Sequence, residues 1–139
     1  DGIIDEETFS QIREMDDPDD PELFSAGIVF GFFDQAEQTF GEMRRAISEK
    51  NLEQLSSLGH FLKGSSAALG VFKVQAICET IQNNGKMRDE VRDENITSED
   101  ALKRIKDLLR NAELEYRIAK AWFLKLYPDG GPEGGDEED

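Results

Sequence analysis

Residues 55–70 read LSSLGHFLKGSSAALG, and this stretch decides the fold. Leucines and small residues recur in it every three or four positions, which is the spacing of one buried face of an amphipathic helix. The residues on that face are Leu55, Leu58, Gly59, Leu62, Ser66 and Leu69. Gly70 is a typical helix terminator, because glycine readily adopts the left-handed backbone conformation that ends many helices. The pattern predicts a helix over residues 52–69 that buries its leucines and exposes His60, the only histidine of the chain.

The exposed side of this helix carries a small patch formed by His60, Lys63 and Gly64. Residues three and four positions apart are neighbours on a helix surface. The patch therefore combines a nucleophile, a cation and bare backbone, as a phosphohistidine site requires. A helical glycine costs about 1 kcal/mol relative to alanine, so we interpret Gly64 as room for another protein's active site to close over the imidazole. The alternatives are a surface histidine without function and a glycine that serves only helix packing.

The run from His60 to Gly70, followed by CETIQN at residues 78–83, resembles the histidine-containing phosphotransfer (HPt) proteins of multistep phosphorelays. The closest likeness is to the fungal kind, which acts in osmotic and oxidative stress signalling. Further similar segments are EMDD at 14–17, FDQA at 33–36, the lead-in at 51–59 and IAK at 118–120. The resemblance covers most of the chain outside its acidic C-terminal end.

This resemblance implies a phosphoryl relay centred on His60. The histidine would accept a phosphoryl group from the aspartyl phosphate of a hybrid sensor kinase's receiver domain and pass it to the aspartate of a response regulator. Lys63 would stabilise the negative charge on the transferring group, and Gln82 matches a family glutamine that contacts the phosphoryl group. The chain would be a relay intermediate rather than an ATP-dependent kinase, located in the cytoplasm and nucleus. We expect no cofactor of its own, with Mg²⁺ held by the partner receiver domain.

The resemblance also implies an apolar docking surface for receiver domains beside His60. Its expected members are Ile12, Met15, Asp16, Phe24, Ile28, Gly31, Gln35, Phe61 and Ser65. Gly31 stands where the family has a glutamine, so one contact with the partner is expected to differ.

Composition excludes several other classes of function. The net charge of −15 over 139 residues argues against nucleic acid and anionic membranes as partners, since both require a basic surface.

The single Cys78 cannot form an internal disulfide and lies on an apolar stripe, which predicts a buried structural thiol. We expect no metal site, because the acidic run at 16–22 has Pro21 where a calcium-binding EF-hand loop needs glycine. No membrane-spanning stretch or secretory leader is expected either.

Apolar periodicity along the rest of the chain predicts an all-α fold, an antiparallel four-helix bundle with an additional short N-terminal helix. The expected helices comprise residues 3–15, 24–49, 52–69, about 72–87 and 98–126. In the second helix, Phe24, Ile28 and Phe32 form an apolar line separate from the core stripe. A polar connection precedes the last helix, with Thr97 or Ser98 as its N-cap. Residues 1–128 form one domain, expected as a monomer, and residues 129–139 a flexible Gly/Pro/acidic tail.

Two alternatives to the relay remain. A helical adaptor would bind receiver domains without any phosphate chemistry, and His60 would then be incidental. The phosphoacceptor domain of a histidine kinase would carry an acidic residue directly after the histidine, where this chain has Phe61, and would need an ATP-binding domain. Replacement of His60 by glutamine separates the relay from the adaptor.

Overall fold

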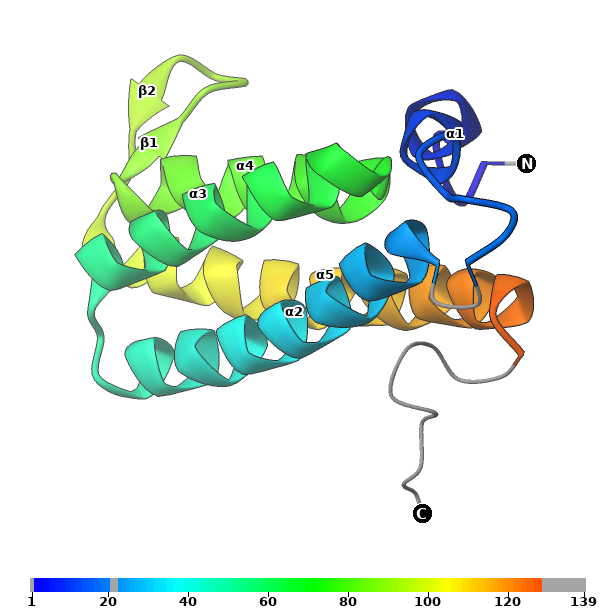
Figure 1. The fold of residues 1–139 in the computed structure, drawn as a ribbon. Helices are drawn as coiled ribbons and strands as arrows, with labels where there is room; N and C mark the ends of the chain where they lie inside the picture. The colour runs from blue at the N-terminus through cyan, green and yellow to red at the C-terminus, as the bar shows by residue number, and fades with distance from the viewer. Residues whose placement is uncertain (1, 21–22, 129–139) are drawn as a thin grey trace.

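The computed structural model describes residues 2–20 and 23–128, and the predicted tail at 129–139 lies outside this part of the chain. Four long antiparallel helices form a bundle, and a short helix lies crosswise at one end of it (Figure 1). The elements are α1 (Glu6–Arg13), α2 (Phe24–Ser48), α3 (Leu52–Leu69), α4 (Phe72–Gly85), β1 (Arg88–Asp89), β2 (Glu94–Asn95) and α5 (Ser98–Leu126). The predicted all-α bundle with an additional N-terminal helix is confirmed.

The ends of α3 and α5 lie where the sequence predicts them. The side chain of Asn51 accepts a hydrogen bond from the amide of Gln54 at 3.0 Å, which starts α3. Gly70 ends that helix in the left-handed conformation, with φ of 80°. Thr97 caps α5 by accepting a hydrogen bond from the amide of Asp100 at 3.1 Å. Each cap satisfies a backbone group that the helix itself leaves unpaired.

The core consists of the predicted apolar stripes, with aromatic rings of α2 and α5 at its centre. Phe33 and Phe40 of α2 pack against Tyr116 of α5 at centroid distances of 6.3 and 5.5 Å. Cys78 of α4 is fully buried, as predicted. Burial raises the pKa of its thiol to about 12, so the group stays protonated and packs as a small apolar side chain.

The predicted second apolar line of α2 is only partly exposed. Phe24 and Ile28 are 49% and 40% exposed, whereas Phe32 is 4% exposed and belongs to the core. The Phe32 ring contacts Tyr116 at a centroid distance of 6.1 Å. The three side chains therefore do not form one exposed surface, because α5 covers Phe32.

The predicted ends of three helices need correction. The opening helix is shorter than residues 3–15, since the carboxylate of Asp5 accepts from the amide of Thr8 at 3.4 Å and starts the helix there. Ile3 and Ile4 precede α1 and Met15 follows it. The helix α2 stops at Ser48 with Glu49 as its C-cap, and α4 stops at Gly85.

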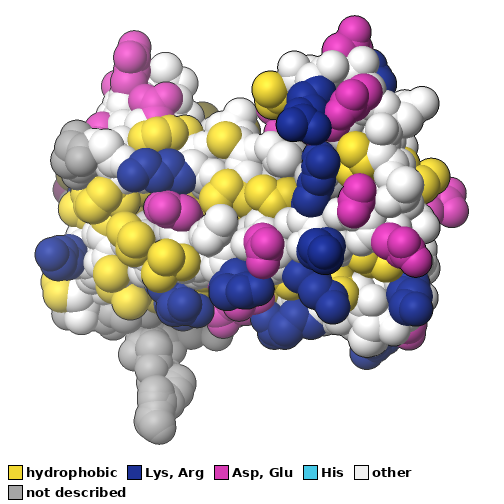
Figure 2. Space-filling view, turned by 180° about the vertical axis from the view of Figure 1, so that it is seen from behind, with side chains coloured by type: hydrophobic (Ala, Val, Ile, Leu, Met, Phe, Trp, Pro, Cys, Tyr) yellow, Lys and Arg dark blue, Asp and Glu magenta, His cyan; other side chains and the backbone are white. Residues whose placement is uncertain are grey.

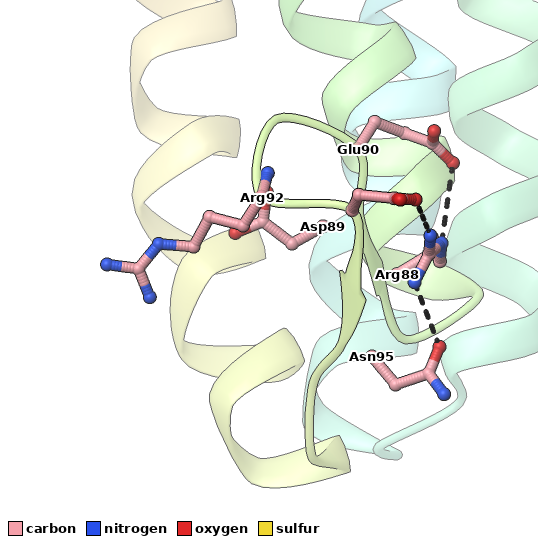
Figure 3. Close-up of polar contacts among 6 residues, drawn as sticks. Arg88, Asp89, Glu90, Arg92 and Asn95 are labelled. Carbon is pink, nitrogen blue, oxygen red and sulfur yellow. Dashed lines mark hydrogen bonds and ion pairs between the residues drawn. The ribbon is translucent and has the colours of Figure 1, made fainter.

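The predicted polar connection between α4 and α5 contains a two-stranded antiparallel hairpin, which the sequence analysis missed. Arg88 lies opposite Asn95 in it, and the Arg88 guanidinium contacts the side chains of Asn95, Glu90 and Asp93 (Figure 3). An ion pair of 2.9 Å between Arg104 of α5 and Asp89 attaches the hairpin to the bundle. None of the described helices combines the length and hydropathy that a membrane span needs.

Candidate functional site

His60 lies in the middle of α3 with its side chain exposed to solvent. Within the described residues, the imidazole takes part in none of the side-chain hydrogen bonds or ion pairs. Lys63 follows one turn later, half-buried, and is likewise absent from the ion pairs of this part of the chain. The arrangement leaves one nucleophile and one nearby cation available to a molecule that approaches from solvent.

Gly59 and Gly85 allow α3 and α4 to pack closely beside the histidine. A methyl group on Gly59 would lie 2.9 Å from the backbone oxygen of Cys78 and 3.0 Å from the amide nitrogen of Gln82. A methyl group on Gly85 would lie 2.8 Å from the amide nitrogen of Ser56. The distances of 2.9 and 2.8 Å are shorter than real Cβ contacts, and 3.0 Å is tighter than most of them, so α4 can occupy its position only against bare backbone.

Gln82 is the residue that this close packing brings next to the turn of His60. The hydroxyl of Ser56 donates to the backbone oxygen of Gln82 at 3.0 Å, which fixes this part of α4 against α3. The side-chain Oε1 of Gln82 is buried and has no hydrogen-bond partner among the described residues. The amide nitrogen at the other end of this side chain is a hydrogen-bond donor.

Gly64 has a different environment from Gly59, although both belong to α3. It is exposed, and a methyl group built on it meets no atom within 4 Å. The fold therefore does not require a glycine at this position, in agreement with the expectation that Gly64 is no packing glycine.

We expect the substitution Gly64→Ala to stabilise the protein by about 0.5–1 kcal/mol, because alanine has the higher helix propensity and the methyl group meets no neighbour. Urea unfolding followed by circular dichroism measures this free energy. A loss of stability would show that the glycine serves the fold rather than access to His60.

Four of the predicted docking residues form one exposed line along α2. Phe24, Ile28, Gly31 and Gln35 follow at steps of four, three and four residues, and all four are exposed. Because α2 lies side by side with α3, this line stands on the helix next to the one that carries His60 (Figure 1). The structure thus brings this exposed line and the histidine onto neighbouring helices.

The remaining predicted docking residues differ in their exposure and in their hydrogen bonds within the chain. Met15 and Phe61 are 68% and 48% exposed, whereas Ile12 is half-buried. The hydroxyl of Ser65 donates to the backbone oxygen of Phe61 at 3.3 Å. Asp16 is half-buried, and both of its carboxylate oxygens accept hydrogen bonds from Ser25. Its side chain is therefore already engaged within the chain, a role that the sequence analysis did not predict.

Away from His60, a groove of about 460 Å³ lies between α2 and α5. Lys120 pairs with Glu37 across it at 2.7 Å, and Arg44 pairs with Glu113. Burial alone would raise the pKa of Glu37, but hydrogen bonds from Lys120 and Tyr116 outweigh it and lower this pKa.

Figure 2 shows the side of the molecule turned away in Figure 1, where hydrophobic side chains gather over one half and many Lys and Arg side chains over the other. The large exposed hydrophobic residues of α5 are Leu114, Ile118 and Leu124. Among the described residues, no group of three or more His, Cys, Asp or Glu side chains is placed to hold a metal ion.

A four-helix bundle that presents an exposed histidine beside a lysine and an open glycine is the architecture of a phosphotransfer domain. The sequence model of the Hpt domain matches residues 28–115, and the chain belongs to this family. The family resemblance stated from the sequence is therefore confirmed.

The most informative relatives are fungal. The chain is 44% identical over 126 residues to multistep phosphorelay regulator 1 of Schizosaccharomyces pombe, which covers 90% of this chain and 42% of that protein. It is 52% identical over 84 residues to phosphorelay intermediate protein YPD1 of Candida albicans, covering 60% of this chain and 45% of that protein. The chain thus spans about half the length of the curated relatives it matches.

A solved structure agrees with this result. The Saccharomyces cerevisiae histidine phosphotransfer signaling protein Ypd1, co-crystallised with the receiver domain of its downstream response regulator Ssk1, matches with a TM-score of 0.78 and 36% identity. The match covers 91% of this chain and 95% of that one. A plant relative, the phosphotransfer protein MtHPt2 of Medicago truncatula, matches with a TM-score of 0.73 and 26% identity.

Proposed function

We propose that this chain is a phosphorelay intermediate that carries a phosphoryl group on His60. The observation that carries the proposal is the exposed imidazole, which has no hydrogen-bond partner among the described residues and lies one turn from Lys63 and the open Gly64. The donor is the aspartyl phosphate in the receiver domain of a hybrid sensor kinase, and the acceptor is the receiver aspartate of a response regulator. The names of the fungal relatives and the complex of yeast Ypd1 with a receiver domain support this assignment.

The chemical step requires little from this chain beyond positioning. The lone pair of one imidazole nitrogen of His60 forms the N–P bond as the bond between phosphorus and the aspartyl oxygen breaks, and the electron pair of that bond stays on the leaving carboxylate. The second imidazole nitrogen carries the proton through the step. Lys63 faces the negative charge on the equatorial oxygens, and the amide nitrogen of Gln82 donates to one of them. Mg²⁺ in the acidic pocket of the receiver domain would neutralise further charge there.

The proposal extends to the setting of the relay. The chain acts as a monomer in the cytoplasm and nucleus and transmits osmotic or oxidative stress signals. Support for this setting comes from the likeness to fungal phosphorelay proteins. A single exposed histidine also suits a carrier that meets its receiver domains one at a time.

We expect Lys63→Gln to slow phosphoryl transfer about 10- to 100-fold, because a positioned cation stabilises the charge of the transition state. Lys63→Arg keeps the charge and should recover part of the rate. Rapid-quench measurement of transfer from a phosphorylated receiver domain gives these rates, and Lys73→Gln, an exposed lysine after the end of α3, is the matched control. Transfer at the wild-type rate by Lys63→Gln would remove Lys63 from the mechanism.

The alternative, an adaptor that only binds receiver domains, is favoured by the exposed line from Phe24 to Gln35, which would dock a partner with or without chemistry. The test uses the receiver domain of yeast Ssk1, phosphorylated on its aspartate and mixed with this chain. A relay moves the phosphoryl group from the receiver to this chain in a stoichiometric burst. An adaptor binds the receiver and leaves only its slow release of inorganic phosphate.

A further inference from the structure

A chain of hydrogen bonds, part-buried at Asp16 and buried between Ser25 and Tyr127, joins the segment after α1 and the start of α2 to the end of α5. The hydroxyl of Ser25, at the start of α2, lies 2.6 Å from the carboxylate of Asp16 and 2.6 Å from the hydroxyl of Tyr127. The amide of Ser25 donates to the other oxygen of Asp16 at 2.7 Å. Ser25 is fully buried and Tyr127 is 6% exposed. We refer to Asp16, Ser25 and Tyr127 together as the latch.

The direction of the hydrogen bonds in the latch follows from its chemistry. A carboxylate has no proton to give, so Asp16 accepts from both the amide and the hydroxyl of Ser25. The Ser25 hydroxyl has only one proton, and Tyr127 must therefore be the donor in the remaining bond. The phenol of Tyr127 thus orients the serine hydroxyl toward Asp16, although 102 residues separate Ser25 from Tyr127.

Two exposed apolar residues are the direct chain neighbours of the latch. Met15 precedes Asp16 and Phe24 precedes Ser25, and their exposed fractions are 68% and 49%. Because Asp16 is bonded to Ser25, the backbone positions of Met15 and Phe24 are fixed relative to each other. The residue before α2, Leu23, makes no side-chain cap, so Asp16 also satisfies an amide at the start of this helix.

We propose that Tyr127 is a positioning residue for the docking of receiver domains. It does not touch the partner, but it holds Asp16 and Ser25, and through them Met15 and Phe24, in the arrangement that a receiver domain recognises. The inference rests on the proposed function and adds to it a buried residue at the end of α5 that sets affinity for the partner. Loss of the phenol hydroxyl alone should therefore weaken docking and leave the chemistry at His60 unchanged.

The experiment compares two buried tyrosines that differ in their place in the fold. Tyr127→Phe removes the hydroxyl that bonds Ser25, and Tyr116→Phe removes the hydroxyl that donates to Glu37 at the groove between α2 and α5. Isothermal titration with the receiver domain of yeast Ssk1 gives the dissociation constant of each. We expect Tyr127→Phe to weaken binding about 3- to 10-fold and Ser25→Ala to weaken it more, because a disordered docking segment must be ordered again on binding.

Tyr116→Phe should bind like the wild type, even if it lowers the unfolding midpoint as much as Tyr127→Phe does. The transfer rate at saturating receiver domain should stay within about twofold of wild type for Tyr127→Phe, as expected when only ground-state binding is lost. In a Met15→Ala background, the effect of Tyr127→Phe should be smaller, since one of the two side chains that it positions is gone.

Each result has a distinct meaning. Equal binding by Tyr127→Phe and wild type, or equal weakening by both tyrosine variants, would overturn the positioning role. Full additivity of Tyr127→Phe and Met15→Ala would overturn it as well. Absence of both binding and transfer in the wild-type chain would instead contradict the proposed function.

Discussion

The substitution His60→Gln is expected to abolish phosphoryl uptake and to leave the folded bundle intact. Glutamine has no nucleophilic nitrogen, so the loss should be complete within the sensitivity of the assay, at least about 10³-fold. The imidazole is exposed and forms no hydrogen bond within the described residues, so the change in unfolding free energy should stay within about 0.5 kcal/mol. Transfer of radiolabelled phosphate from a phosphorylated receiver domain measures the loss.

Ser57→Gln is the matched control, because it places the same side chain on the exposed side of α3 one turn before the histidine. This variant should accept phosphate. His60→Gln should also bind the receiver domain with an affinity within about threefold of wild type. Docking is assigned to the exposed line of α2 rather than to the imidazole. Uptake that persists in His60→Gln would transfer the phosphoacceptor role to another residue.

The second large effect is expected at Gly59. The substitution Gly59→Ala should destabilise the protein by about 1–3 kcal/mol, although alanine is the better helix former. The added methyl group would lie 2.9 Å from the oxygen of Cys78 and 3.0 Å from the nitrogen of Gln82. Both are backbone atoms of α4, so the clash can be relieved only by moving one helix away from the other.

Urea unfolding of Gly59→Ala and Gly64→Ala side by side gives the sharpest measurement, because the same chemical change is made twice in one helix. We expect opposite signs, with loss of stability at Gly59 and gain at Gly64. Movement of α4 would also displace Gln82 from the turn of His60, and transfer should slow in Gly59→Ala. Equal effects at the two glycines would contradict the close packing of α3 and α4.

The central helix and its histidine could be predicted because the information is local. The leucine stripe of residues 55–69 has the period of a helix, Asn51 and Gly70 mark its ends, and the phase of the stripe exposes His60. The role proposed for Gln82 rests on the family resemblance, since nothing in the local pattern distinguishes it from an ordinary surface glutamine. Its place beside α3 depends on the absence of a side chain at Gly59.

The hairpin between α4 and α5 could not be predicted from periodicity. Its strands contain two residues each and are dominated by charged side chains, whereas a strand signal needs several alternating apolar residues. Ion pairs of Arg88 and Arg104 with nearby carboxylates hold it instead. Such pairs depend on which segments meet in space.

Contacts between segments that are distant in the sequence also explain why the prediction of the docking surface was incomplete. The sequence pattern identified Phe24 and Ile28 as an apolar line, but it also included Phe32, which α5 covers. Asp16 was interpreted only through the resemblance, as a partner contact. Its bonds to Ser25, and the bond from Ser25 to Tyr127, join positions 9 and 102 residues apart, and no local signal reports them.

A phosphoryl relay through this chain depends most directly on which residue is modified, and intact-mass spectrometry after incubation with a phosphorylated receiver domain tests this. We predict a mass increase of one phosphoryl group that is lost in acid, is stable in base and is absent from His60→Gln, because phosphohistidine alone combines these properties. No mass increase with receiver domains that bind the chain would contradict the relay and leave an adaptor. An acid-stable increase that persists in His60→Gln would contradict the assignment of the site.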